Sequence, residues 1–213
     1  MKLKIDLHVH TIHSKDAFTE LELVALKVRE KGLDGVAITD HNHITNAEEL
    51  GIIGIPGVEV STTEGHILGL GVTHPISRGL PPETTIEEIW RQSGIAVIPH
   101  PYDLVSPSVN PESVRVRPDA LETVNSSTFM FNLATRKAKK KALRLRLPAV
   151  GGSDSHLPET IGDAFSIIDS QSAEISDILD AIRDNRTIAH GKASRIGSKI
   201  KKIWLQARKC SRY

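Results

Sequence analysis

The stretch KLKIDLHVHTIHSKDA, residues 2–17, combines a strand pattern with a dense group of side chains that can bind metal. Apolar and polar residues alternate from Leu3 to Val9, and this period of two is typical of a β-strand. His8 and His10 are two residues apart, so a strand would place both on the same side, where they could bind one ion. A solvated loop or a few packed histidines would explain the same residues. Further ligands elsewhere in the chain are needed to decide between these interpretations.

Beyond this stretch, short apolar runs alternate with helical patterns. Strands are expected at GVAITD (35–40), GIPGVEVS (54–61), GHILGLGV (65–72), IAVIP (95–99), ALETVN (120–125), PAVGGSD (148–154), AFSIID (164–169) and TIAH (187–190). Helices are expected at 19–32, at 84–94 with a threonine cap at the start, at 129–145 and at 172–185. This alternation predicts a single α/β domain, either a closed (βα) barrel or an open doubly wound sheet. The third and fourth strands are expected to form a hairpin.

The composition restricts the class of protein. The chain has 213 residues and a formal net charge of +1, which gives no general attraction to nucleic acid or membranes. Its single cysteine, Cys210, excludes an internal disulfide and a cysteine-based zinc site. No apolar stretch approaches the roughly 20 residues of a membrane span. Met1 is followed directly by a strand pattern and not by a signal peptide. These features predict a cytoplasmic protein.

Six of the predicted strands end in, or lead into, side chains that can bind a metal ion. They are His8, His10, His13 and Asp16 after the first strand, Asp40, His41 and His43 after the second, then Glu59, His66, His100, Asp154 and His156. In a (βα) barrel the C-terminal ends of the strands open onto one face, so these residues would meet in one cleft. Imidazole nitrogens and carboxylate oxygens without thiolates suit Zn, Mn or Fe. So many ligands imply two or three divalent ions.

Each of these residues also has a purely structural interpretation. A single histidine at a strand end is more often a packed or loop residue than a ligand. Asp40 and Asp154 could cap the helices that follow them, and Glu59 could pair with a lysine or an arginine. The combination of so many ligands on one face favours the metal centre, and with it the barrel over the open sheet.

The motifs DLHVHTIHSKDA, ITDHN, GVEVSTTEGHILGLGV, VIPHP and GGSDSH resemble, in order and spacing, those of the PHP (polymerase and histidinol phosphatase) family. The resemblance covers about residues 5 to 165. It implies a distorted (βα)7 TIM-like barrel, with residues 1–213 forming one domain. It also implies a site that binds two or three divalent ions and hydrolyses phosphoesters. The members most similar to this chain are small, stand-alone metal-dependent phosphoesterases.

The resemblance also implies a ligand set by position. The metal ligands would be His8, His10, Asp16, His41, Glu59, His66, His100, Asp154 and His156, with Glu59 bridging two ions. The family often has SDG where this chain has SKDA, so Asp16 is shifted by one position and His13 competes as the loop ligand. Some members carry another histidine shortly after the position of Asn125, and this chain has TFMFN there.

The expected reaction is attack on phosphorus by a hydroxide bound between the ions. His41, His43 or His156, where not bound to metal, could protonate the leaving oxygen, and Arg195 could clamp a phosphate. The expected substrate is a phosphorylated small molecule or a nucleotide.

Two other classes of function remain open. A nuclease or a nucleic-acid-processing subunit with a PHP-type barrel would use the basic stretch RKAKKKALRLR (136–146), but the aromatic content is only 4%, which leaves few rings to stack on bases. A non-catalytic scaffold could keep metal ions for stability alone. The retained ligand set argues against that interpretation, because a site that has lost its function usually loses several ligands.

The basic C-terminal segment, residues 196–213, has a helical pattern. It places Ile196, Ile200, Ile203, Trp204 and Ala207 on one face, with lysines opposite. We expect an amphipathic helix that packs on the far side of the barrel or at a subunit interface, and a membrane-surface helix is the alternative. The sequence does not indicate an oligomeric state.

Overall fold

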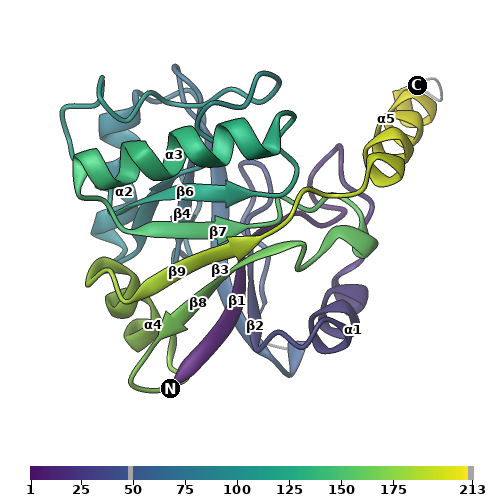
Figure 1. Cartoon of the computed structure of the whole chain (residues 1–213), viewed down its shortest axis with the longest axis horizontal. Coiled ribbons are helices and arrows are strands. Elements are labelled where there is room, and N and C mark those ends of the chain that lie inside the picture. The colour runs from purple at the N-terminus through teal and green to yellow at the C-terminus, as the bar shows by residue number, and fades with distance from the viewer. Residues whose placement is uncertain (48–49, 211–213) are drawn as a thin grey trace.

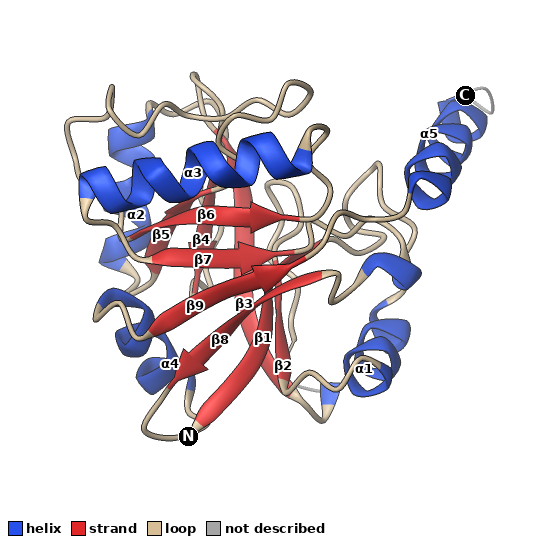
Figure 2. Cartoon of the chain, viewed as in Figure 1, coloured by secondary structure: helices blue, strands red, loops and turns tan. Residues whose placement is uncertain are grey.

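The computed structural model describes residues 1–47 and 50–210, and within them one curved sheet forms the centre of the molecule (Figure 1). Its strands are β1 (Lys2–Val9), β2 (Gly35–Ile38), β3 (Ile53–Ser61), β4 (His66–Leu70), β5 (Ile95–Ile98), β6 (Ala120–Asn125), β7 (Ala149–Gly152), β8 (Ala164–Asp169) and β9 (Thr187–Gly191). The helices are α1 (Leu21–Glu30), α2 (Pro82–Arg91), α3 (Phe131–Leu145), α4 (Ile175–Arg183) and α5 (Ile196–Cys210). Figure 2 shows the helices around the outside of the sheet.

The sheet has the order β7-β6-β5-β4-β3-β2-β1-β8-β9 and curls into a nearly closed barrel. The barrel closes where the chain beyond β7 lies parallel to β1, with a bridge between Val9 and Ser155, and β8 and β9 follow β1 in the sheet. The backbone N–H of His10 donates to the carbonyl of Ser155 at 2.9 Å, and that of Ser153 donates to Asp6 Oδ1 at 2.8 Å. These contacts hold the ends of β1 and β7 side by side. The predicted ligands His8 and His10 at the end of β1 are thereby brought close to Asp154 and His156, which follow β7.

The predicted α/β barrel is confirmed, although its strands differ in number and direction from a regular (βα)7 barrel. The expected hairpin is present: β3 and β4 are antiparallel, with Glu59 opposite Leu68. The short connection between them leaves no room for the crossover that a parallel pair requires. β8 also runs antiparallel to β1, and β9 extends the sheet beyond β8.

The apolar core closes the end of the barrel where β1 begins and leaves the end where β1 finishes free for a site. Leu3, Ile5 and Leu7 of β1 belong to an apolar cluster shared with β3 to β6 and with α4. Ile178 and Ile182 of α4 are fully buried in the same cluster, so α4 closes the barrel at the end where β1 begins. Burial of apolar surface drives this packing. The polar residues at the opposite ends of the strands are left free to form a cleft.

The start of α2 differs from the sequence prediction. We expected a threonine cap at residue 84, but the helix begins at Pro82 and Thr85 lies within its first turn. Proline suits this position because its fixed φ is already helical and the first turn needs no N–H from it. Thr85 Oγ1 instead donates to the carbonyl of Pro81 at 3.1 Å.

The position of α5 also differs from expectation. We predicted packing on the far side of the barrel or at a subunit interface, but α5 projects from the same end as the cleft (Figure 1). Gln206 Nε2 donates to the carbonyl of Asp16 at 3.3 Å, and Lys201 Nζ lies 2.6 Å from Glu159 Oε1. The interface role stays a prediction, and residues 211–213 of the predicted segment lie outside the described residues. None of the described helices has the length and apolar character needed to cross a membrane.

Candidate metal centre

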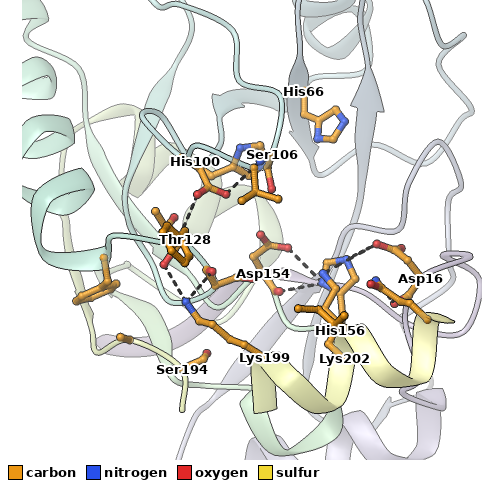
Figure 3. Close-up of a pocket in the computed structure, with 18 of the residues that line it drawn as sticks. Asp16, His66, His100, Ser106, Thr128, Asp154, His156, Ser194, Lys199 and Lys202 are labelled. Carbon is orange, nitrogen blue, oxygen red and sulfur yellow. Dashed lines mark hydrogen bonds and ion pairs between the residues drawn. The ribbon is translucent and has the colours of Figure 1, made fainter. Parts of the chain in front are cut away.

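The strand ends of the barrel bring nine predicted ligands to one cleft. β1 and its loop supply His8, His10 and Asp16, the loop after β2 supplies His41, β3 and β4 supply Glu59 and His66, β5 leads into His100, and β7 leads into Asp154 and His156. Figure 3 shows side chains from these segments pointing toward one another across the cleft. Residues separated by almost 150 positions in the sequence are therefore neighbours in the fold.

Glu59 lies at the centre of the cluster and is buried. Both of its carboxylate oxygens face histidine nitrogens. The distances are 3.0 Å from Oε2 to His41 Nδ1, 3.2 Å to His10 Nε2 and 3.5 Å to His8 Nε2, and 2.9 Å from Oε1 to each of His66 Nδ1 and His100 Nε2. A carboxylate with both oxygens surrounded by imidazoles has the geometry needed to bridge two cations.

Two further carboxylates complete the cluster. Asp154 Oδ1 lies 3.4 Å from His10 Nε2 and 3.4 Å from His156 Nδ1. Asp16 Oδ2 lies 3.0 Å from His156 Nε2, and its Oδ1 lies 3.8 Å from His41 Nε2. The loop therefore directs Asp16 into the cleft. His13 is exposed and stacks on His43 with a centroid separation of 4.8 Å, so the structure does not bring it to the cluster.

The donor atoms fit divalent cations. Among the described residues, three overlapping sets have donor atoms within 4.8 Å of one another: His8, His10 and Glu59; His10, His41 and His156; and His41, Glu59 and His66. His8 Nε2 and His10 Nε2 approach to 3.2 Å. Asp16 Oδ1, His66 Nδ1 and His100 Nδ1 are buried without a hydrogen-bond partner, although His66 Nδ1 lies close to Glu59. Buried polar groups normally have partners, so these atoms indicate a site for cations.

The electrostatics of the cluster support the same assignment. Burial would lower the pKa of His10, but hydrogen bonds with Asp154 and Glu59 raise it to about 9. Burial would raise the pKa of Glu59, but the neighbouring His8 charge and hydrogen bonds from the other histidines lower it well below its usual range. The metal-free cluster therefore favours protons on His8 and His10, whose pKa values burial would lower but the neighbouring carboxylates raise. Cations would replace those protons on binding.

A layer of hydrogen bonds behind the cluster orients the first two histidines. His8 Nδ1 lies 3.1 Å from Glu122 Oε1, which directs His8 Nε2 toward Glu59. His10 Nδ1 lies 3.1 Å from Ser14 Oγ, which in turn donates to Asp40 Oδ1 at 2.7 Å. Partners of this kind fix the ring orientation and the tautomer of metal-binding histidines. Asp40 therefore lies behind the cluster and is not part of it.

The backbone at the strand ends has unusual conformations. His100 has φ of 35° and Asp154 has φ of 52°, both in the left-handed region that side chains other than glycine seldom adopt. The His100 N–H donates to Glu122 Oε2 at 2.7 Å, which helps to hold this conformation. Gly152 lies so close to His8 that a Cβ at this position would be 2.5 Å from His8 Cβ. Local strain of this type is common at functional sites.

Sequence reasoning missed several residues of the site and named two that lie elsewhere. His43 and Arg195 are exposed and do not line the cleft. Glu122 could have been found, because a single carboxylate in the buried strand ALETVN is the same signal that identified Glu59 in GVEVS. Lys199 and Lys202 line the cleft in place of Arg195, and only the direction of α5 reveals this.

The cleft has a volume of about 790 Å³. Its floor contains Glu59, His100, Asp154 and other residues of the cluster. One wall is formed by α5 and the other by the loops that follow β5 and β6. Lys199 Nζ donates to the carbonyls of Ser127 and Thr128 at 3.0 and 2.9 Å, which fixes the ammonium group at the edge of the cleft (Figure 3).

A nearly closed α/β barrel with a histidine and carboxylate cluster at its strand ends is an arrangement that can hold divalent cations, as in metal-dependent hydrolases of the TIM-like class. The PHP domain model matches residues 6–105 and the PHP-associated model matches residues 132–187. The chain belongs to the PHP family, and the predicted enzyme class, a metal-dependent phosphoesterase, is confirmed.

Two relatives cover most of the chain. The uncharacterized protein MJ1587 of Methanocaldococcus jannaschii is 33% identical over 159 residues, which is 65% of this chain and 93% of that protein. A probable phosphatase of Syntrophotalea carbinolica is 26% identical over 213 aligned residues, which is 81% of this chain and 88% of that protein.

Solved structures show the same fold at low sequence identity. A two-domain protein of Bacteroides vulgatus containing a predicted PHP-like metal-dependent phosphoesterase has a TM-score of 0.74 and 19% identity, covering 90% of this chain and 65% of that one. The lesion-specific endonuclease EndoQ of Pyrococcus furiosus has a TM-score of 0.62 and 17% identity, covering 86% of this chain and 56% of that one. The chain thus spans about two thirds or less of these longer proteins.

Proposed function

We propose that this protein hydrolyses phosphoesters of small molecules or nucleotides with two or three divalent ions, Zn, Mn or Fe, bound in the cleft. The observation that carries the proposal is the position of Glu59. Its two oxygens lie 2.9–3.5 Å from nitrogens of five histidines, so one buried carboxylate can be shared between adjacent cations. Multinuclear sites that hydrolyse phosphoesters rely on such shared ligands.

The nine ligands divide into overlapping groups around Glu59. His8, His10 and Asp154 would hold one cation with it, and His41, His66 and His100 would hold another. Asp16 and His156 form a third corner with His10 and His41. When bound, the ions supply Lewis-acid chemistry, lowering the pKa of water and offsetting the charge on phosphoryl oxygens.

The remaining residues of the cleft would bind and orient the substrate. Lys199 and Lys202 place two positive charges beside the cluster, where they attract a phosphate dianion before it reaches the ions. His41 is half-buried at the edge of the cluster and lines the cleft. Where His41 or His156 is not bound to metal, we assign to it the transfer of a proton to the leaving oxygen.

Elemental analysis combined with a phosphoester panel tests this proposal. The wild-type protein should retain divalent metal after dialysis and should release inorganic phosphate from at least one class of phosphoester. Glu59→Gln should lose both properties, because an amide leaves one side of the cluster without a carboxylate oxygen. His74→Ala is the matched control, since His74 is exposed and lies outside the cluster. Wild-type protein that binds no divalent metal would refute the proposal.

Nucleic acid is a second candidate substrate, and one observation supports it: the fold is similar to that of a lesion-specific endonuclease. The predicted basic stretch, however, lies on α3 outside the cleft, where Lys141 and Arg144 both pair with Glu112. Its charges are therefore partly neutralised within the molecule. Cleavage of an oligonucleotide with a steep dependence on salt would favour this candidate over small phosphoesters.

A further inference from the structure

The cleft continues outward from the metal cluster into a rim of apolar side chains. The rim consists of Val105, Phe129, Ile196, Ile200 and Ile203. Each of these side chains is between 61% and 76% exposed. They come from three separate segments, namely the loop after β5, the loop after β6 and helix α5. Single exposed apolar residues are normal on a protein surface, but a group that surrounds one cleft indicates a binding site.

Helix α5 is held in place by polar contacts and not by its apolar stripe. Lys199 Nζ bonds to the carbonyls of Ser127 and Thr128, and Gln206 Nε2 bonds to the carbonyl of Asp16. An amphipathic helix normally buries its apolar stripe against the core. In α5 the three isoleucines of the stripe, Ile196, Ile200 and Ile203, line the cleft and are exposed, so their surface is available to a molecule that enters the cleft.

Two lysines, Lys199 and Lys202, line the same cleft as the cluster and this rim. Lys199 uses two of its three N–H donors on carbonyls, which leaves one donor for an incoming ligand. Lys202 Nζ lies 4.0 Å from Asp16 Oδ2 (Figure 3). A ligand that fits these surfaces carries a phosphate at the cluster end and an apolar group at the rim end.

We propose that the substrate is a phosphomonoester whose leaving group carries an apolar ring. This inference rests on the proposed phosphoesterase function and specifies its substrate class. In the reaction, water adds its oxygen to phosphorus, the ester P–O bond breaks, and the leaving oxygen takes up a proton. The products are inorganic phosphate and an alcohol or phenol whose ring has been in contact with the rim. A sugar phosphate or glycerol phosphate would leave the rim in contact with water.

Two phosphonates provide a matched test of binding that does not depend on turnover. Phenylphosphonate and methylphosphonate share the same head group, so the ratio of their dissociation constants reports the contribution of the ring. With the manganese-loaded protein, isothermal titration calorimetry should show phenylphosphonate binding about tenfold more tightly, because one face of the ring leaves water. The double variant Val105→Ser, Ile200→Ser should reduce this ratio to about twofold or less.

A control variant separates the rim from the general surface. Ile188→Ser removes another exposed isoleucine, which lies on β9 away from the cleft, and should leave the ratio unchanged. All three positions are exposed, so each variant should keep its melting temperature.

Each other outcome overturns the inference in a distinguishable way. Equal binding of both phosphonates by an enzyme that cleaves polar phosphoesters would refute the ring preference and leave the proposed function intact. Absence of phosphonate binding together with absence of any hydrolysis would refute both. Light scattering could instead show that the wild type is a dimer and the double variant a monomer, with the same ratio of phosphonate dissociation constants for both. That result would show that a second copy of the chain covers the rim.

Discussion

Replacement of Glu122 by glutamine tests whether the layer behind the cluster controls metal binding. The carboxylate accepts with both oxygens: Oε1 faces His8 Nδ1 at 3.1 Å, and Oε2 accepts from the His100 N–H at 2.7 Å and from Asn125 Nδ2 at 2.8 Å. A glutamine amide has one acceptor oxygen, so its NH₂ group must face a donor on one side. The substitution therefore leaves a buried donor unsatisfied, which costs about 1–3 kcal/mol of stability.

The same substitution should weaken metal binding. With Glu122→Gln, either His8 loses the partner that fixes its tautomer or His100 loses the bond that holds its backbone. Loss of such partners typically lowers metal affinity about 10- to 100-fold, or about 1.4–2.7 kcal/mol. Competition with a chromophoric chelator at pH 7.5 measures this change. Circular dichroism in parallel confirms that the variant is folded.

Glu112→Gln is the matched control, because Glu112 is a carboxylate that pairs with Lys141 and Arg144 away from the cleft. It should leave metal affinity unchanged. If folded Glu122→Gln protein bound metal within twofold of the wild type, the role assigned to Glu122 would be refuted.

Three further predictions concern the cluster directly. The pKa of His10 is raised to about 9, so the folded metal-free protein binds more protons than the unfolded chain between about pH 6.5 and 9. Urea titrations should therefore show that the free energy of unfolding of the metal-free protein falls by up to about 3 kcal/mol as pH rises through this window. The metal-loaded protein should lose far less. Equal losses in the two forms would contradict this prediction. Asp16→Asn should reduce bound metal per chain by elemental analysis, whereas His13→Ala should not, and the reverse result would assign the loop ligand to His13. Gly152→Ala should lower the free energy of unfolding by about 1–3 kcal/mol, because its new Cβ would lie 2.5 Å from His8 Cβ. Gly197→Ala should not lower the free energy of unfolding, because a Cβ at Gly197 would have no atom within 4 Å. Equal melting temperatures of the two variants would contradict the steric argument.

The cluster could be predicted from the sequence because its ligands follow strands. His8 and His10 alternate with apolar residues in one strand, and the barrel geometry places strand ends from distant segments on one face. The strand and helix positions could also be predicted, because each segment has a clear hydrophobic period and a clear stop signal. Local patterns and one general rule of fold geometry were sufficient for this part of the molecule.

The remainder of the site depends on tertiary geometry that local patterns do not contain. The apolar stripe of α5 predicts burial, but Lys199 and Gln206 bind carbonyls at the edge of the cleft, so the helix lies on the cleft side. This shift also replaces Arg195 by Lys199 and Lys202 as the cations of the cleft. The antiparallel pairing of β8 with β1 is another long-range feature, because nothing within AFSIID indicates which strand it joins.

Anomalous X-ray diffraction from crystals soaked in manganese tests the central claim most directly. The account predicts two or three anomalous peaks, separated by about 3.5–4 Å, with Glu59 in contact with at least two of them. A single peak that does not involve Glu59, or peaks confined to surface carboxylates, would contradict a shared cluster of cations in this cleft.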